Sequence, residues 1–181
     1  MADWIFIVAN GVAKAFRELP SGKRRIMAFL FADDVLGLAE CGRYVDTVQT
    51  VTPVTLYRIR LDLLLEMLRQ DSTFQLQFLS KVAHELRQSL RQTIVLSRRD
   101  AVGRVAMFLH MLDQHERQQD GASQIEIPMS RSDIANFLGL SLGAVIRASR
   151  RLEQSGLVAF DGLHAARILN RRRFEDLATG V

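Results

Sequence analysis

The sequence predicts an α+β protein with strands first, a long helix next and a winged helix-turn-helix last. Short apolar segments separated by turn residues fill residues 4–59. Apolar residues spaced by three and four then run over 74–115 without a proline. Residues 130–158 have the spacing of two short helices joined by a tight turn. The predicted parts are a strand domain 1–72, a long helix 73–117 and a winged helix-turn-helix domain 118–181.

The composition narrows the class of protein. With 181 residues, 48% of them hydrophobic, the chain is long enough for one or two globular domains. No apolar stretch approaches the ~18 residues of a membrane span, and the first residues lack the features of a secretory signal. Cys41 is the only cysteine, which excludes an internal disulfide and a cluster held by about four thiolates. We therefore expect a cytoplasmic protein with no membrane contact.

Turn residues divide the first part into strands. Asn10-Gly11 suits a tight two-residue hairpin, and Pro20-Ser21-Gly22 marks a second turn. These turns predict a small antiparallel barrel or sandwich. The expected strands are Trp4–Ala9, Val12–Glu18, Arg25–Phe31 and Val48–Ile59, the last being one or two strands divided at Pro53.

The second part is predicted to be helical. A short helix, Leu61–Arg69, precedes Asp71-Ser72, which suits a cap for the next helix. A helix over 74–115 would extend about 60 Å, more than so small a domain can cover. Its apolar stripe therefore predicts pairing with a second copy of the chain. The alternative is a helix broken near Ser97–Gly103, each half packed in its own domain. The stripe consists of Leu79, Val82, Leu86, Leu90 and Ile94.

The segment 130–158 carries the functional signal. Gly139 lies where a first helix must turn, Leu140 fills the corner and Ser141 suits the cap of a second helix. The predicted inner positions are Ile134, Ala135 and Leu138 of the first helix and Val145, Ala148 and Leu152 of the second. This spacing is typical of a DNA-binding helix-turn-helix.

Arginines share the outer side of the second helix, at i, i+3 and i+4. Such a row can also be the solvated face of an ordinary helical hairpin, but the turn spacing favours double-stranded DNA as the partner. Gly156 should end the helix, and Asp161-Gly162 should turn a small hairpin, the wing. A last short helix should carry Arg171–Arg173, and the sequence leaves open whether these arginines contact DNA phosphate or only solvent. The candidate DNA contacts are Ser130, Arg131, Ser141, Leu142, Gly143, Ile146, Arg147, Arg150 and Arg151.

The order of segments resembles the Crp/Fnr superfamily of bacterial regulators over nearly the whole chain. The resemblance rests on FIVANGVAKAF, RRIMAFLFADDVLGLAE, RRDAVGRVAMFL and SRSDIANFLGL, and SGKRRIMAFLF is most similar to the FixK/Fnr-like branch. It implies a cyclic-nucleotide-binding-like β-roll, a dimerisation helix and a winged helix. It also implies a homodimer on a two-fold symmetric site, with RNA polymerase as a candidate partner.

The chain departs from that family pattern at several places. The family has about 40 residues before Trp4, so the resemblance implies a partial, N-terminally truncated roll. Gly37-Leu38 and Tyr44-Val45 replace the pairs that bind a cyclic nucleotide, unless Arg43 takes that role, so we expect no cyclic AMP binding. At the position where the family commonly has a glutamate, this chain has Gly143. The arginine of the family pattern is kept as Arg147, and an arginine can bind a guanine edge.

The sequence also bears on two other functions, an enzyme and an interaction module. The four histidines are scattered and no glycine-rich phosphate loop is present, so we predict neither an enzyme nor a cofactor nor a metal site. The alternative to a regulator is a truncated interaction module that pairs with a full-length relative without binding DNA well itself. The sequence leaves open the signal, the promoters, activation or repression, and whether Met1 is the true start.

Overall fold

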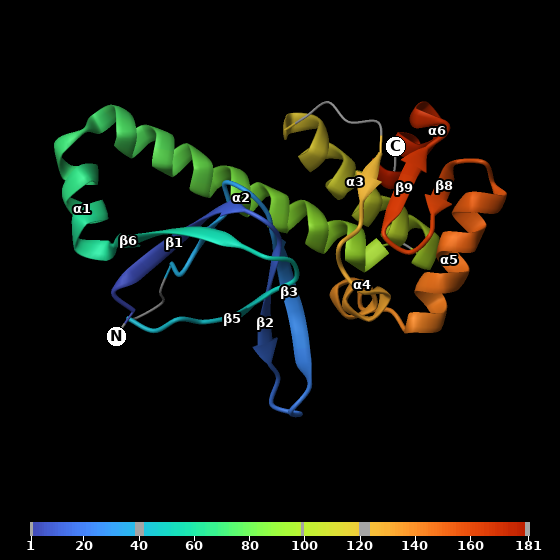
Figure 1. Cartoon of the computed structure of the whole chain (residues 1–181), viewed down its shortest axis with the longest axis horizontal. Helices are drawn as coiled ribbons and strands as arrows, with labels where there is room; N and C mark the ends of the chain where they lie inside the picture. The colour runs from blue at the N-terminus through green and yellow to red at the C-terminus, as the bar shows by residue number, and fades with distance from the viewer. Residues whose placement is uncertain (1, 39–41, 99, 120–123, 180–181) are drawn as a thin grey trace. The chain divides into compact units, whose positions relative to one another are not determined.

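The computed structural model describes residues 2–38, 42–98, 100–119 and 124–179, and the chain divides into two compact units. The first unit covers residues 1–91 and the second covers 92–181 (Figure 1). Helix α2, Ser72–Arg98, begins in the first unit and ends in the second.

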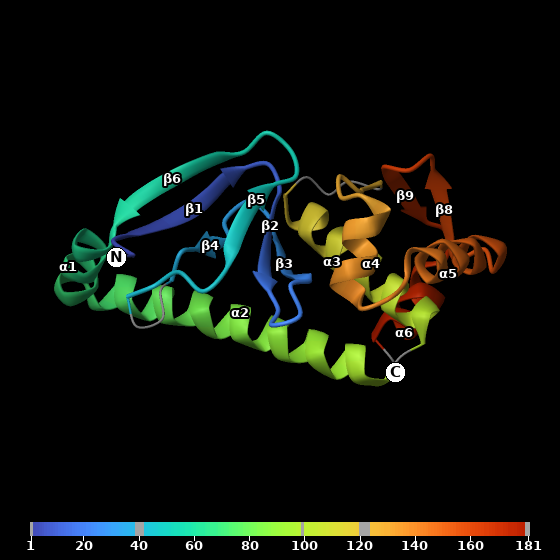
Figure 2. The ribbon, with the colours of Figure 1, turned by 90° about the horizontal axis from the view of Figure 1, so that it is seen from below.

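The first unit contains two three-stranded antiparallel sheets (Figure 2). One sheet has the order β4-β1-β6 and the other has the order β3-β2-β5. Each of β1, β2 and β3 buries two side chains, Ile5 and Val8, Ala13 and Ala15, and Ile26 and Phe29, which form the core of this unit. The predicted strands are confirmed, and the two-residue β4 was not foreseen. The bounds are β1 Trp4–Asn10, β2 Ala13–Glu18, β3 Arg24–Leu30, β4 Val35–Leu36, β5 Thr47–Thr50 and β6 Thr55–Arg60.

The hairpin predicted at Asn10-Gly11 is wrong. Strand β1 pairs with β4 and β6, whereas β2 pairs with β3 and β5, so the chain changes sheets at Gly11. Gly11 has φ 88°, and a Cβ there would lie 2.1 Å from the carbonyl oxygen of Pro53. The Val12 amide donates to Thr52 Oγ1 at 2.8 Å. Contacts with residues about 40 positions away therefore decide this turn. The turn at 20–22 is confirmed as the β2–β3 hairpin.

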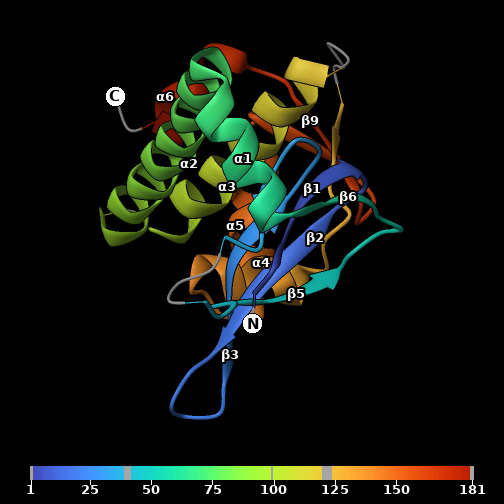
Figure 3. The ribbon, with the colours of Figure 1, turned by 90° about the vertical axis from the view of Figure 1, so that its left-hand side faces the viewer.

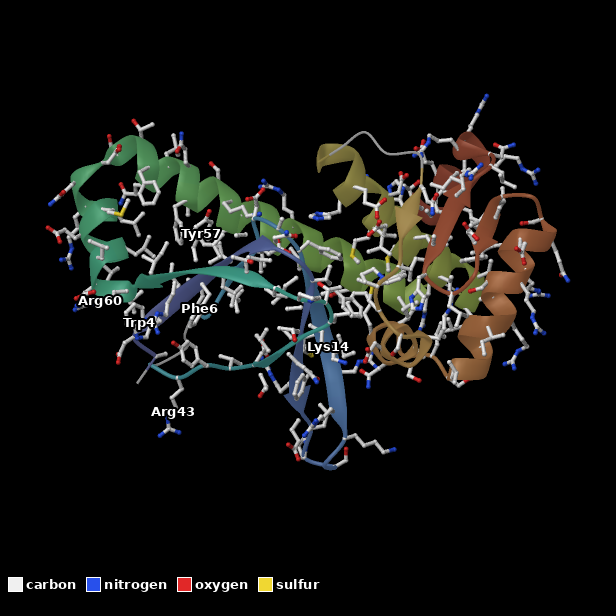
Figure 4. The ribbon with its side chains drawn as sticks, in the orientation of Figure 1. Trp4, Phe6, Lys14, Arg43, Tyr57 and Arg60 are labelled. Carbon is white, nitrogen blue, oxygen red and sulfur yellow. The ribbon has the colours of Figure 1, made fainter. Side chains whose placement is uncertain are left out.

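The edge strand β6 and the segment before β5 lie at the surface. Figure 4 shows Trp4 and Phe6 of β1 on one side of the sheet and Tyr57 of β6 on the other, while Arg43 points away from the sheet. Arg43 is exposed, and Tyr44 Oη donates to the carbonyl oxygen of Trp4 at 2.9 Å. The shifted role considered for Arg43 therefore finds no support in this geometry.

The predicted 74–115 helix is two helices, so the expectation of one continuous helix is wrong. Helix α1, Leu61–Gln70, follows β6 and leads into α2 (Figure 3), and α3 is Ala101–Gln119. Asp100 caps α3, because its Oδ1 accepts from the Gly103 amide at 2.9 Å. Asp71 caps α2 in the same way, as predicted, by accepting from the Thr73 and Phe74 amides. The break lies in the range given by the alternative prediction.

The apolar stripe of α2 is open to solvent. Leu79, Val82, Leu86 and Leu90 are 62%, 37%, 60% and 55% exposed, and the side chain of Ile94 lies outside the described residues. On the other side of α2, Lys81 Nζ lies 3.8 Å from Asp34 Oδ1. A row of exposed leucines on one helix face is typical of an interaction surface.

The second unit packs four helices and a small sheet. The helices are α3, α4 Arg131–Leu138, α5 Leu142–Gln154 and α6 Arg171–Thr179. The sheet has the order β7-β9-β8, with β7 Ile125–Glu126, β8 Val158–Asp161 and β9 Ala165–Ile168. The predicted helix-turn-helix, wing and last helix are all present. Within the described parts, no helix has the length and apolar character to cross a membrane, and no His/Cys/Asp/Glu cluster suits a metal.

A buried carboxylate joins α6 to α3. Arg171 donates from Nη1 and Nη2 to the two oxygens of Asp113, at 2.7 and 2.9 Å, and Asp113 is 4% exposed. These bonds raise the pKa of Arg171 above its usual range. Arg171 therefore joins α6 to α3, a role that the sequence analysis did not foresee. Arg172 and Arg173 are exposed.

Replacing Asp113 with alanine is expected to lower the free energy of unfolding by about 2 kcal/mol. The loss stays below that of a fully buried pair because the Arg171 side chain is 37% exposed. Urea unfolding of the full chain, followed by circular dichroism, measures the change. Arg172→Ala removes an exposed arginine from the same helix and should change stability by less than about 0.5 kcal/mol. Equal losses in the two variants would contradict the role given to the ion pair.

Candidate nucleic-acid interface

The turn between α4 and α5 follows from three residues. Ser130 Oγ accepts from the Asp133 amide at 3.0 Å and so caps α4. The helix ends at Gly139, which has φ 65° and ψ 36°, a left-handed conformation that favours glycine. The next amide, that of Leu140, donates back to the Ala135 carbonyl at 2.9 Å. The second helix can therefore start at a fixed angle to the first.

The inner faces of both helices are buried as predicted. These positions are Ile134, Ala135, Leu138, Val145, Ala148 and Leu152, each at most 5% exposed. Phe137 was missed by the sequence analysis. It is buried too, and its ring meets the ring of Phe108 on α3 edge-on at 6.0 Å. Arg104 of α3 donates to the carbonyl oxygen of Leu138 at 3.1 Å. Helix α3 therefore holds the helix-turn-helix from behind.

The N-terminal half of α5 presents an open surface. Ser141 Oγ accepts from the Ala144 amide at 3.2 Å, and Leu142 and Ile146 are 44% and 40% exposed. Gly143 lies between them, and a Cβ there would be 3.2 Å from Nη1 of Arg147. The guanidinium of Arg147 thus lies back along the helix toward its first turn.

The C-terminal half of α5 continues the same exposed side. Arg150 and Arg151 are both exposed and lie one turn beyond Arg147. The structure therefore brings seven of the nine predicted contacts onto α5 and its cap, and it places Ser130 at the start of α4. These contacts with DNA remain predictions.

Arg131 is the exception among the nine. Its Cζ lies 5.2 Å from the ring centroid of Phe160 on β8, and the side chain is half-buried. Burial lowers the pKa of Arg131. The stacked geometry directs this arginine toward the wing rather than toward the open side of α5.

The wing is a short hairpin that differs slightly from its prediction. Asp161 pairs with Ala165, so the loop is Gly162-Leu163-His164 rather than the predicted two-residue turn at Asp161-Gly162. Gly162 has φ 64°. On β9, Ala166 is buried and Arg167 is exposed. Sequence analysis missed Arg167 and Phe160, although the alternation of buried and exposed residues along a strand was the available signal for Arg167.

Two protein families match the chain in the order that the structure shows. The cyclic nucleotide-binding domain family matches residues 1–71, and the Crp-like helix-turn-helix domain family matches residues 103–177. The first match covers the two sheets and α1, and the second covers α3 to α6.

Relatives and solved structures extend over nearly the whole chain. The transcriptional activatory protein AadR of Rhodopseudomonas palustris is 31% identical over 181 residues, which are 98% of this chain and 74% of AadR. The nitrogen fixation regulation protein FixK of Bradyrhizobium diazoefficiens is 30% identical over 94% of this chain and 72% of its own.

The structure of FixK2 from Bradyrhizobium japonicum has a TM-score of 0.87 and 29% identity, covering 97% of this chain and 87% of that one. A CooA mutant from Carboxydothermus hydrogenoformans, with a TM-score of 0.77 and 16% identity over 97% of this chain and 79% of that one, shares the fold. The chain has a strand unit and a capped helix-turn-helix, and it is 31% identical to AadR over 74% of that protein. The chain therefore belongs to the Crp/Fnr family of DNA-binding transcription regulators.

Proposed function

We propose that this regulator acts in the cytoplasm as a homodimer, with the α5 helix of each subunit in the major groove of one half-site. The observation that carries the proposal is the open surface of α5, where an arginine and two aliphatic side chains surround a capped helix start. In this proposal the second unit, whose core includes α3, binds DNA, the exposed stripe of α2 pairs the subunits and residues 1–72 form the roll-like domain.

Each exposed side chain of α5 has a distinct role in this proposal. Arg147 donates two hydrogen bonds to a guanine edge, because the N-terminal part of a recognition helix enters the groove. Leu142 and Ile146 offer apolar contact to neighbouring bases, and Gly143, which has no side chain, allows the close approach of the backbone. The remaining contacts are with phosphate, by Ser130, Ser141, Arg150 and Arg151.

The exposed stripe of α2 supports the homodimer. Two subunits that pair through it would hold two α5 helices at a fixed separation, which matches a two-fold symmetric site. Because AadR is named a transcriptional activatory protein, we extend the proposal to activation, with RNA polymerase as the further partner.

Selection from a randomised duplex pool tests the proposal. The full chain should enrich a two-fold symmetric sequence containing a G·C pair in each half, and affinity should fall steeply with salt. Light scattering at micromolar concentration should give about twice 20.5 kDa. A dimer that enriches no sequence, yet exchanges subunits with full-length FixK, would instead support the interaction-module alternative.

A further inference from the structure

Arg131 lies in an environment that is unfavourable for a positive charge. Arg131 is the first residue of α4, where the helix dipole opposes a positive charge. Its side chain is half-buried, and this burial lowers the pKa of Arg131. The one described contact of its guanidinium is the face of the Phe160 ring.

Phe160 lies where the wing meets both helices of the motif. It is on β8, paired with Ala166 of β9, and its ring lies under Arg131 of α4. Its backbone amide donates to Glu153 Oε1 of α5 in a long bond of 3.5 Å. The same residue therefore connects the wing to α4 through its side chain and to α5 through its backbone.

The wing carries one exposed cation beside this contact. Arg167 of β9 pairs with Ala159, the neighbour of Phe160, and it is exposed while Ala166 is buried. A hairpin this short has few contacts of its own, so its position depends on what it packs against. Any shift of Phe160 would move Arg167 with it.

We propose that the stacked pair of Arg131 and Phe160 fixes the wing against the helix-turn-helix, and thereby holds Arg167 for a DNA phosphate. Arg131 is in this view a positioning residue, and its removal weakens DNA binding through the wing. The inference rests on the DNA-binding function proposed above and assigns a further part of that interface.

A double-mutant cycle in the full chain tests the inference. Affinity for the selected duplex is measured by fluorescence anisotropy at several salt concentrations. Phe160→Leu leaves the charge unchanged, yet it should weaken binding about three- to tenfold and reduce the salt slope by about one, because Arg167 no longer meets its phosphate. Arg131→Ala should have the same two effects, and the double variant should be no worse than either. Phe160→Tyr keeps the aromatic face and should bind like the unmodified protein.

Other variants separate this inference from its rivals. When Phe160→Leu is added to the Arg167→Ala variant, it should change neither the affinity nor the salt slope any further. Arg24→Ala is the matched control, because Arg24 stacks on Phe16 at 5.1 Å in the other unit, and it should leave the slope unchanged. Additive effects of Arg131→Ala and Phe160→Leu, with the slope changed only by the former, would assign Arg131 its own phosphate and overturn the proposal.

Failure of the proposed function gives a different result. If the unmodified chain binds no duplex, hydrogen exchange still tests the pair, because Arg131→Ala should then speed exchange of the β8 amides. Unchanged exchange of those amides in Arg131→Ala would show that the stacked pair does not hold the wing, whatever the chain binds.

Discussion

Leu86→Glu should leave the protein monomeric and weaken its binding to a two-fold site by about 10²- to 10⁴-fold. Leu86 is central in the α2 stripe and 60% exposed, so a glutamate costs the subunit little by itself. In the dimer, however, two facing carboxylates would be buried among leucines, which is strongly unfavourable. Without the dimer, each half-site must be bound separately, and the gain from linking the two events is lost.

Light scattering and anisotropy on full and half-sites measure both effects. Gln77→Glu introduces the same side chain on the opposite face of α2, since nine residues place position 77 about 180° from Leu86. That control should remain a dimer with unchanged affinity. A mass near twice 20.5 kDa for Leu86→Glu would show that another surface joins the subunits.

Arg147→Ala is expected to weaken binding to the selected site by about 1–3 kcal/mol, roughly 5- to 150-fold, and to relax the preference at one base pair. Arg147 is exposed, and its guanidinium lies back toward the helix start, the part of α5 that enters the groove. Loss of a bidentate contact to guanine removes both binding energy and discrimination. Competition against the randomised pool shows which base pair is affected.

Arg151→Ala is the matched control for Arg147→Ala. Arg151 is an exposed arginine on the same helix, one turn further on, where α5 leaves the groove floor. Its loss should weaken all sequences alike and reduce the salt slope by about one. If Arg147→Ala kept the full sequence preference, base reading would have to come from Leu142 and Ile146 or from the shape of the DNA.

Elements fixed by nearby residues were predicted correctly from the sequence. The helix-turn-helix is one case, since Ser141 and Gly139 act within a few residues of their own positions. The hairpin at Asn10-Gly11 failed because the partners of β1 and β2 come from distant segments, such as Thr55–Arg60. A local turn preference cannot compete with a whole ladder of strand hydrogen bonds.

Contacts between residues far apart in the chain account for the other differences between the sequence-based predictions and the structure. Asp113 and Arg171 are separated by 58 positions, so the sequence shows two charges but not that they meet. The contact of Arg131 with Phe160 is hidden in the same way, which is why the sequence places Arg131 among the candidate DNA contacts. The end of α2 depends on Asp100, whose capping role competes with helix continuation and has no unique sequence signal.

Packing and the proposed recognition use separate residues of α5. Val145, Ala148 and Leu152 are buried and hold the helix in place, while Leu142, Ile146 and Arg147 lie at the surface. Mutations on the outer side can therefore accumulate without loss of folding, and a new promoter preference needs only a few codon changes. The helix start carrying Gly143 is in this respect an exchangeable part, which related regulators can diversify while their scaffold stays constant.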